Sequence, residues 1–534
     1  MLLTNILFSS PYDMILAGDP VLEDILYLSL ESGKSILSFT APFAPHEIKR
    51  FLDSIDVSNL SIPAQEAFNR VNRRLNPQAP ISISGDSFLF MLNINSTIET
   101  RTRFNSDISW LPQYPKTPPL LSLPLRFYFS DFVQLYMEPI IAVNPVFYNN
   151  QKYFEHNVLQ NDLDNLEQNM PLRAFMAIGN SWWNFQLGRD RLSYGTGQMG
   201  NLAISDNPHF YEFARLSFFT DFFKYSVLVS QMPLDITGIY DMTNATDNTL
   251  IHTTHRYFYL HRLDFSLFNK LSIGLMEGVM VGNSPLEIRY LNPMMIFHSF
   301  YSWLNYPPWD AGNDKPEGSG DMNGSLFSLE INWNVLESLA VYGQFVMNQF
   351  ATNYKIKRWG TQPNGLGYLA GVRHSRSFGE WGSVFFVEFI YTDPYLYMNP
   401  SPFASFIHMR YISGGINSLL YSFVGFPRDA IAATMGVSLF YNNIIHFLGK
   451  FTLVTQGEHK IYWDWKNTAE AYNAATPTGT AETKLITSLD ARYSISSYIT
   501  LKGGISGIFS FNNTHLSGSN IFGGQTEVSI NFHY

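Results

Sequence analysis

From about residue 80 onward, apolar and polar side chains alternate along the chain, and this pattern limits the possible folds more than any other feature. Ten windows carry full or partial alternation: residues 81–98, 120–143, 173–189, 212–230, 257–281, 326–349, 368–391, 431–456, 484–510 and 526–534. Side chains of a β-strand point alternately to its two faces, so each window predicts strands with one apolar and one polar wall. Most windows are long enough for two strands joined by a tight turn, which predicts a large antiparallel all-β fold.

The last window, residues 526–534, shows the alternation most clearly. One face carries Val528, Ile530, Phe532 and Tyr534, and the other carries Glu527, Ser529, Asn531 and His533. A soluble β-sandwich could also end in such a strand. A strand that ends on an aromatic carboxy-terminal residue resembles the closing strand of bacterial outer-membrane β-barrels. The resemblance implies the barrel-insertion machinery as a partner of this strand.

Composition favours the membrane barrel over the soluble sandwich. Aromatic residues make up 16% of the chain and charged residues 15%, whereas soluble domains contain about 25% charged residues. The sequence has no uninterrupted run of 18 or more apolar residues, the length that a spanning helix needs. These properties are typical of a transmembrane barrel, whose strands are apolar on one side only. We therefore expect an integral protein of the bacterial outer membrane, with lipid against its apolar walls.

Charge and cysteine content argue against several other classes. The net charge of −10 disfavours nucleic acid as a partner, because nucleic-acid binding needs a basic surface. The chain has no cysteine, so it forms neither disulfides nor thiolate metal sites. Residues 1–10 are too short for a secretory signal and lack its basic region. They are either the remnant of a signal that starts further upstream or an ordinary apolar strand or tail.

The connections between strands fall into two length classes. Short candidate turns are residues 130–131, 268–270, 334–337, 377–381 and 494–497, and longer polar insertions are residues 149–169, 235–252, 305–324 and 464–482. Periplasmic turns and longer extracellular loops are typical of outer-membrane barrels. At roughly 25 residues per strand and connection, residues 79–534 predict about 16–18 strands. The last strand should pair with the first, near residues 81–98, so that no edge stays open.

Residues 1–78 form a separate region, in which the apolar period becomes helical. Asp19 and Pro20 predict the start of a helix that ends at Gly33, and Pro45 and Pro63 start two further helices. Each of these three short helices has one apolar stripe, and none is large enough to bury that stripe alone. We expect them to pack on one another or on the barrel.

Three stretches resemble a known family. Residues 182–207 contain a Gly-Arg pair, a Gly-x-Gly-x-x-Gly cluster and an Asn-Leu-x-x-Ser-x-Asn run, similar to the central motif of the Wzi-like capsule-assembly outer-membrane proteins. The matching positions are Gly188, Arg189, Gly195, Gly197, Gly200, Asn201, Leu202, Ser205 and Asn207. Arg289, Tyr290, Asn292 and Pro293 resemble a later Arg-Tyr-x-Asn-Pro element, and residues 19–75 resemble the family's helical segment. Tyr194 departs from the family, because many members have Trp there.

The resemblance implies a large outer-membrane barrel whose amino-terminal helices occlude the periplasmic side or the lumen. It also implies a non-enzymatic, lectin-like role in the assembly, surface attachment or export of capsular polysaccharide or exopolysaccharide, with that polysaccharide as the partner. The alternation alone predicts the barrel but not the polysaccharide. The alternative is a porin or channel for nutrients or polymers, in which the helices are a movable plug or an external cap.

One group of candidate ligand-binding residues lies in the central motif. Arg189 and Arg191 share a strand face with Leu187, and we expect them in the lumen because a lipid-facing arginine costs about 2–4 kcal/mol near the middle of the membrane. They either form ion pairs with luminal acids or bind an acidic sugar through bidentate guanidinium contacts. Tyr194 is a further candidate beside them.

A second group of candidates lies in two insertions. Trp303, Trp309 and Asp310 belong to a Pro/Gly-rich insertion, and Trp463 and Trp465 flank an aspartate in another. Aromatic rings can stack on sugars while carboxylates bind hydroxyl groups, which is lectin chemistry. The alternative is interfacial aromatic residues beside a solvated loop.

The motifs of common enzymes are absent from the sequence. The glycine cluster at residues 195–200 lacks the following helix of a dinucleotide site. We therefore predict that its glycines allow a tight bend or a close backbone approach inside the barrel. No His-Glu-x-x-His, Gly-x-Ser-x-Gly or P-loop sequence occurs. Isolated acids such as Glu388 and Asp393 do not establish a glycosidase. We expect no enzymatic activity, no cofactor and no metal.

Overall fold

The structure is a computed structural model of the whole chain. It describes residues 13–76, 78–85, 87–105, 108, 118–129, 132–151, 153–159, 162–233, 256–282, 285–297, 323–350, 363–399, 402–412, 417–421, 423–426, 428–462 and 474–534.

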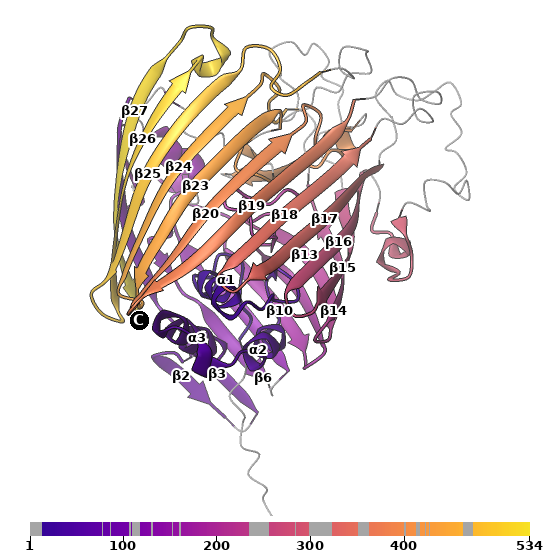
Figure 1. Cartoon of the computed structure of the whole chain (residues 1–534), viewed down its shortest axis with the longest axis vertical. Helices are drawn as coiled ribbons and strands as arrows, with labels where there is room; N and C mark the ends of the chain where they lie inside the picture. Colours follow the sequence, from indigo (N-terminus) through magenta and orange to yellow (C-terminus); the bar gives the residue numbers. More distant parts are fainter. Residues whose placement is uncertain are drawn as a thin grey trace, which may run out of the picture.

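Most of the described strands form one closed antiparallel barrel (Figure 1). Three of its strands are interrupted: β3 (Phe88–Leu92) with β4 (Asn95–Phe104), β5 (Leu121–Ser122) with β6 (Leu125–Phe129), and β7 (Val133–Glu138) with β8 (Ile140–Ile141). Fifteen are continuous: β10 (Arg173–Gly179), β11 (Trp183–Asp190), β13 (Tyr211–Phe219), β14 (Phe223–Gln231), β15 (Arg256–Leu267), β16 (Leu271–Gly282), β17 (Asn323–Leu336), β18 (Leu339–Gln349), β19 (Gly365–Phe378), β20 (Trp381–Thr392), β23 (Ala430–Tyr441), β24 (Ile445–Gln456), β25 (Glu482–Ser494), β26 (Ile499–Phe511) and β27 (Ile521–His533). Three interrupted and fifteen continuous strands make 18 within the described ranges, inside the predicted span.

The last strand closes the ring as predicted. β27 pairs with β26 on one side and with β4 on the other, from Gly524 opposite Phe104 to His533 opposite Asn95. Val528 is 58% exposed on the outside, whereas Ser529 is 2% exposed and faces the lumen. β2 (Ile81–Ser84) lies outside the ring, and among the described strands it pairs only with β3. The partner of the last strand is therefore residues 95–104, which overlap only the end of the predicted window at residues 81–98.

The outer surface of the carboxy-terminal half is apolar. From β19 to β27 the exposed large side chains include Val372, Phe385, Val387, Met435, Val437, Phe447, Leu489, Ile505 and Ile530. An outward apolar band of this kind is a defining property of transmembrane barrels. The prediction of an all-β membrane barrel is confirmed.

Short turns gather at one end of the barrel, here called the turn end, and the opposite end is called the loop end (Figure 1). At the turn end, Phe268 and Asn269 adopt positive φ in a tight turn between β15 and β16, and residues 379–380 link β19 to β20. The predicted turn at residues 130–131, the insertion at 235–252 and most of those at 305–324 and 464–482 lie outside the described residues.

Three helices fill the turn end: α1 (Val21–Ser32), α2 (Pro45–Asp53) and α3 (Ile62–Leu75). The starts at Pro20, Pro45 and Pro63 agree with prediction, and α1 ends where Gly33 adopts φ +64°. The helices share one apolar core, including Ile25, Leu28, Ile48, Leu52 and Val71. Within the described residues no helix is long and apolar enough to cross a membrane. We call residues 13–76 the plug.

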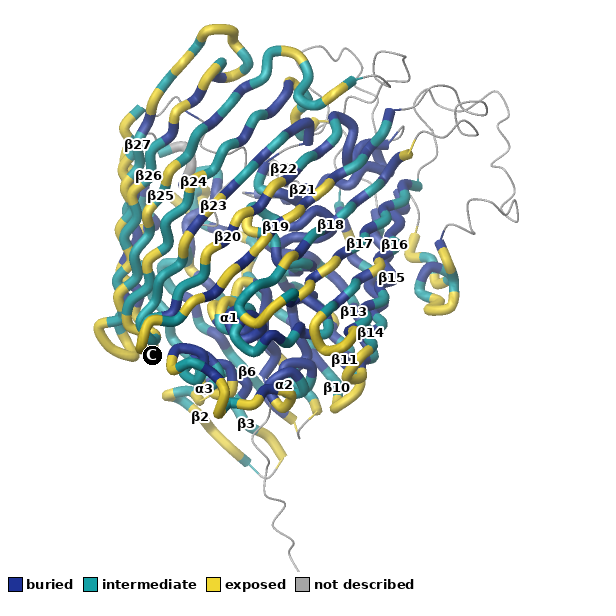
Figure 2. The backbone as a smooth tube through the Cα atoms, in the orientation of Figure 1, coloured by how far each residue is buried: buried dark blue, intermediate teal, exposed yellow. Residues whose placement is uncertain are grey.

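Further segments fill the lumen beyond the plug (Figure 2). The inner loop, residues 191–210, links β11 to β13, and the hairpin of β21 (His408–Ile412) and β22 (Asn417–Tyr421) is separate from the barrel sheet. One apolar cluster joins Leu202 and Ile204 of the inner loop to Phe406, Phe423 and Val424 of the chain around this hairpin. Plug, inner loop and hairpin region therefore follow one another from the turn end to the loop end.

We predict that Val528→Arg destabilises the barrel, because the new charge on the outward face of β27 would enter hydrocarbon at a cost of about 2–4 kcal/mol. Urea unfolding in lipid vesicles, followed by tryptophan fluorescence, measures this change. Val528→Leu is the control and should change the free energy of unfolding little. Equal stability of the arginine and leucine variants would contradict the outward assignment.

Candidate functional site

The inner loop carries the glycine-rich motif and sits at the centre of the lumen. Tyr194, Leu202, Ala203 and Ile204 are at most 1% exposed. The segment between β11 and β13 contains no helix, so it lacks the element that a dinucleotide site needs after its glycines. The motif instead forms a middle layer between the plug and the hairpin region.

Its glycines are required by backbone geometry. Gly195 adopts φ +120°, and a Cβ atom there would lie 1.9 Å from Nε2 of Gln344. Gly200 adopts φ +110° and forms a bridge with Val424, whose Cα would be 3.0 Å from an added Cβ. Residues other than glycine rarely adopt such φ values. The prediction that these glycines allow close backbone approach inside the barrel is confirmed.

Side chains of the barrel wall bind the backbone of the inner loop. The carboxylate of Glu388 accepts hydrogen bonds from the amides of Gln198 (2.7 Å) and Met199 (2.9 Å). Gln344 accepts from the amide of Leu202 at 2.8 Å and donates to the carbonyl of Tyr194 at 2.7 Å. Buried backbone groups need partners when water is excluded. These wall residues therefore fix the path of the inner loop.

Two polar residues of the motif, Asn201 and Ser205, form hydrogen bonds within the filled lumen. Asn201 accepts from the amide of Gly197 at 2.9 Å and donates to Oγ of Ser193 at 3.0 Å. The hydroxyl of Ser205 donates to the carbonyl of Phe423. Asn201 thus closes the glycine turn on itself, whereas Ser205 ties the inner loop to the hairpin region.

The plug is joined to the same inner loop by a short sheet. β1 (Thr40–Ala41) pairs with β12 (Ser193–Tyr194), and the amide of Gly195 donates to the carbonyl of Phe39 at 2.7 Å. From the wall, Nζ of Lys224 contacts Oε2 of Glu47 at 2.5 Å and Oγ1 of Thr40 at 2.8 Å. The plug, the inner loop and the wall are therefore one connected unit.

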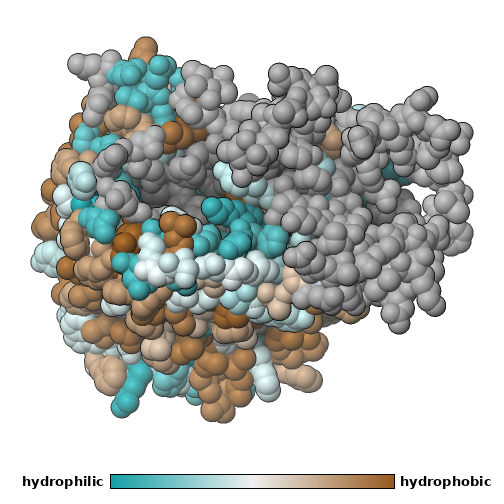
Figure 3. All heavy atoms as spheres, turned by 90° about the horizontal axis from the view of Figure 1, so that it is seen from above, coloured by the Kyte–Doolittle hydropathy of each residue, from teal (hydrophilic) through white to brown (hydrophobic). Residues whose placement is uncertain are grey.

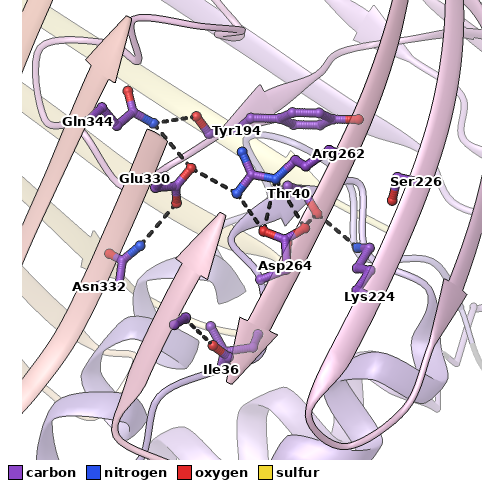
Figure 4. Close-up of polar contacts among 12 residues, drawn as sticks. Ile36, Thr40, Tyr194, Lys224, Ser226, Arg262, Asp264, Glu330, Asn332 and Gln344 are labelled. Atoms are coloured by element: carbon purple, nitrogen blue, oxygen red, sulfur yellow. Dashed lines mark hydrogen bonds and ion pairs between the residues drawn. The ribbon is translucent and has the colours of Figure 1, made fainter. Parts of the chain in front are cut away.

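Buried charges from the wall surround this junction (Figure 4). Nη2 of Arg262 lies 2.7 Å from Asp264 and 3.0 Å from Glu330, and its guanidinium lies 5.5 Å from the centre of the Tyr194 ring. Asn332 donates to Glu330 at 3.0 Å. These ions have left water, which costs several kcal/mol each unless partners compensate. The network compensates them and leaves Tyr194 fully buried.

Arg189 lies on the opposite face from the one predicted. It shares its face with Leu187, which is 47% exposed, whereas Gln186 and Asp190 on the other face are fully buried. Its Nη2 lies 2.5 Å from Glu212 of the neighbouring strand, and its guanidinium lies 4.1 Å from the centre of the Phe210 ring. The prediction that the charged row faces the lumen is wrong for Arg189, because Glu212 and Phe210 supply an outward partner.

Arg191 lies beyond the end of β11 and enters the lumen with the inner loop. Its Nε donates to the carbonyl of His209 at 3.1 Å. Burial, with Arg173 nearby, lowers the pKa of Arg191 to about 10, so the side chain remains a cation at neutral pH. Arg189 and Arg191 therefore do not form one row.

The second family-like element lies against the outside of the barrel. The carbonyl of Pro293 accepts from the hydroxyl of Tyr225, and both ring nitrogens of His261 contact carbonyls of residues 290 and 295. Arg289 pairs with Glu287 at 2.5 Å. Asn292 accepts from the amide of Met294 at 3.1 Å. The barrel wall therefore lies between this element and the inner loop.

The loop candidates Trp303, Trp309, Asp310, Trp463 and Trp465 lie outside the described residues. Sequence reasoning did not single out Lys224, Arg262, Glu330 or Gln344, although they hold the junction together. A signal was present on β15, where Arg262 and Asp264 are two residues apart and so share the polar wall. Their partners on β17 and β18 depend on strand register, which the alternation does not give.

We predict that Gly195→Ala loosens the inner loop, because the new methyl group meets Gln344 and the backbone conformation is unfavourable. The expected loss of unfolding free energy is about 1–3 kcal/mol, measured by thermal unfolding together with limited proteolysis. Gly449→Ala is the control, since a Cβ there has no atom within 4 Å. Equal behaviour of the two variants would rule out a constrained inner loop.

We predict that Glu47→Gln weakens the attachment of the plug, because it leaves Lys224 buried without its anion. Breaking a buried pair costs about 3–5 kcal/mol, whereas an exposed pair contributes about 0–1 kcal/mol. Asp53→Asn breaks the exposed Lys49–Asp53 pair and is the matched control. Amide hydrogen exchange in α2 should accelerate strongly only for Glu47→Gln. Similar exchange in both variants would argue against a role of the Lys224–Glu47 ion pair in holding the plug.

Three solved structures are similar to this chain in fold. A Wzi barrel from Escherichia coli, described as a carbohydrate-binding outer-membrane protein involved in group 1 capsule assembly, superposes with a TM-score of 0.56 at 14% identity, over 97% of this chain and 98% of that one. OccD3 (OpdP) from Pseudomonas aeruginosa gives 0.42 at 8% identity, over 86% and 93% of the two chains. OprD from the same organism gives 0.40 at 8%, over 83% and 94%.

Among curated proteins, no sequence matches this chain. The family model described as capsule assembly protein Wzi matches residues 122–506, which include the inner loop, the wall residues that bind it and the outer element at residues 289–293. The chain belongs to the Wzi capsule-assembly protein family.

Proposed function

We propose that this protein resides in the bacterial outer membrane and acts in the assembly, surface attachment or export of capsular polysaccharide or exopolysaccharide. It does so as a non-enzymatic, lectin-like barrel. Membership of the capsule-assembly family supports this proposal. The E. coli barrel that shares the fold is described as carbohydrate-binding, which favours the same partner class here.

The observation that carries the proposal is the filled lumen. The plug occupies the turn end, the inner loop crosses the middle, and the hairpin region packs above it. Arg410 of β21 pairs with Glu167 of another connection in the described chain, which adds a buried tie near the loop end. A barrel filled in this way is better suited to holding a polymer at its surface than to conducting small solutes.

The polysaccharide would meet the loop end, which faces the cell exterior. Seen from above, hydrophilic residues gather in a hollow of this end (Figure 3). We assign Trp303, Trp309, Asp310, Trp463 and Trp465 to this contact as candidates, because their residue types suit sugar rings and hydroxyls. Arg191 and Tyr194 are weaker candidates, since both are enclosed by the plug and the inner loop.

The chain has two functional units in this proposal. Residues 1–78 are the periplasmic plug region, and residues 79–534 are the barrel with its extracellular loops. The closing strand of the barrel is the element that the insertion machinery would engage.

The non-enzymatic role is supported by the use of Glu388. Its carboxylate accepts two inner-loop amides and the hydroxyl of Tyr342 at 2.9 Å. These bonds occupy the group structurally and leave it poorly placed to transfer a proton to a substrate.

We predict that a strain lacking this protein releases surface polysaccharide into the medium. Quantifying cell-bound and released polysaccharide measures the effect, and the wild-type gene should restore retention. Purified protein should also bind surface polysaccharide on a glycan array. Normal retention in the deletion strain, together with no binding to any glycan, would refute the proposed function.

The channel alternative makes a different prediction. A filled lumen should give no large, steady conductance in a planar bilayer, and deletion of residues 13–76 should raise conductance. Asp53→Asn protein, with an intact plug, is the control. Large conductance through the intact protein would instead favour a porin or channel function.

A further inference from the structure

A cavity of about 420 Å³ lies between the plug and the barrel wall at the turn end. One side is formed by α1 and α3, and the other by β19, β20 and the wall from β23 to β25. Asn442 and Asn443 of the turn between β23 and β24 line it, and Gln198 of the inner loop lines it as well. The cavity therefore runs from the periplasmic end towards the inner loop. Its size falls in the range of small-molecule sites, roughly 300–1,000 Å³.

The wall beside this cavity is less covered than the rest of the barrel. Figure 2 shows buried residues throughout β15 to β18, whereas β24 to β27 are mostly half-buried or exposed. Lys502 is exposed although the alternation of β26 directs it inward, between Leu501 and Gly503 on the outward side. The plug thus leaves polar wall side chains uncovered on this side of the lumen.

Two ion pairs lie within the lining, and the charged lining residues outside these pairs are mostly positive. Arg70 pairs with Asp24 at 2.6 Å, and Arg74 pairs with Asp19 at 2.7 Å. The remaining charged lining residues are Arg73, Arg373, Arg492 and the single acid Glu23. Three cations thus face one anion.

Within the described chain, Arg492 and Arg73 each donate one long hydrogen bond to a neutral group, and Arg492 also interacts electrostatically with Glu23. Arg492 donates to Oδ1 of Asn443 at 3.4 Å, and Arg73 donates to the carbonyl of Asn69 at 3.4 Å. Arg373 is already held, since it donates to the carbonyl of Thr196 and stacks on Tyr342 at 3.9 Å. Arg492 and Arg73 are therefore the groups available to an added anion.

Further cations stand behind Arg492 on the same wall. Strand register places Arg492 of β25 opposite Lys502 of β26, and Lys450 of β24 opposite Ser488 of β25. Burial raises the pKa of Glu23, although Arg492, Lys450 and Lys502 oppose that change. Glu23, and Asp490 beside Lys450, therefore compensate part of the positive charge of Arg492, Lys450 and Lys502.

We propose that this cavity binds the carboxylate of an acidic sugar residue, with Arg492 and Arg73 as its main contacts. Arginine binds carboxylates bidentately, and cavity walls of low polarisability strengthen such contacts. Leu26, Tyr27 and Phe440 supply apolar surface beside the charges, as sugar rings require. The choice of a sugar rests on the assembly or export part of the proposed function, because this cavity lies at the turn end and not at the loop end. The need for an anion rests on the charges alone.

Calorimetric titration of the purified full-length protein in detergent tests this site. The probes are a galacturonic acid trisaccharide and its carboxyl-reduced galactose counterpart, with sulfate as a competitor. We expect the acidic trisaccharide to bind at least tenfold more tightly than the neutral one. Arg492→Gln should weaken binding of the acidic trisaccharide at least tenfold.

Arg376→Gln is the matched control, because it removes the same charge from the outside of the barrel on β19. It should leave binding unchanged. If Arg492→Gln fails to fold, as judged by heat-modifiable gel migration, Arg73→Gln replaces it with the same expected loss.

Three results would overturn the proposal: no binding of the acidic trisaccharide to wild-type protein, equal binding of the neutral trisaccharide, or equal losses in Arg492→Gln and Arg376→Gln. Displacement by sulfate at equimolar concentration would show a general anion site and overturn the sugar assignment. Retention of surface polysaccharide by cells tests the proposed function separately. Loss of retention in the deletion strain, combined with no binding of the acidic trisaccharide, would reject only this cavity.

Discussion

The structure depends on the closure of one hydrogen-bonded ladder. A chain that spans hydrocarbon must pair its backbone groups internally, and only a closed sheet does so with strands. Pairing of β27 with β4 removes the last two open edges. Closure also fixes which way every wall side chain points, because neighbours on a strand alternate. Ser529 must then face inward and Val528 outward, and the polar interior follows from the same register.

That polar interior creates the need for the plug. Arg262 and Lys224 point into the lumen, where the packed chain excludes water, and each would be costly without a partner. Arg262 finds its acids on the wall itself, but Lys224 finds Glu47 on the plug. The inner loop connects both, since Tyr194 pairs with Thr40 and lies beneath Arg262. Wall and plug therefore stabilise each other, and neither reaches its full set of contacts alone.

The sequence predicted the features that arise from local periodicity. Alternation revealed the strands, prolines at 20, 45 and 63 with Gly33 revealed the helices, and the glycine cluster indicated close packing inside the barrel. It did not predict cross-strand partners, because these depend on register between distant segments. Arg189 illustrates the limit: charge suggested the lumen, but Glu212 on the adjacent strand holds it outside. The buried network around Glu330 was missed for the same reason.

The plug is covalently joined to the wall by a very short connection. α3 ends at Leu75, and β2 begins at Ile81 and pairs with β3 at the foot of the first strand. A tether of this length keeps a released segment at an effective concentration in the mM range. A plug that lost one contact would therefore rebind far sooner than a separate protein of equal affinity. Opening of the turn end would be brief and local, and its frequency would be set by the contacts at Lys224 and the inner loop.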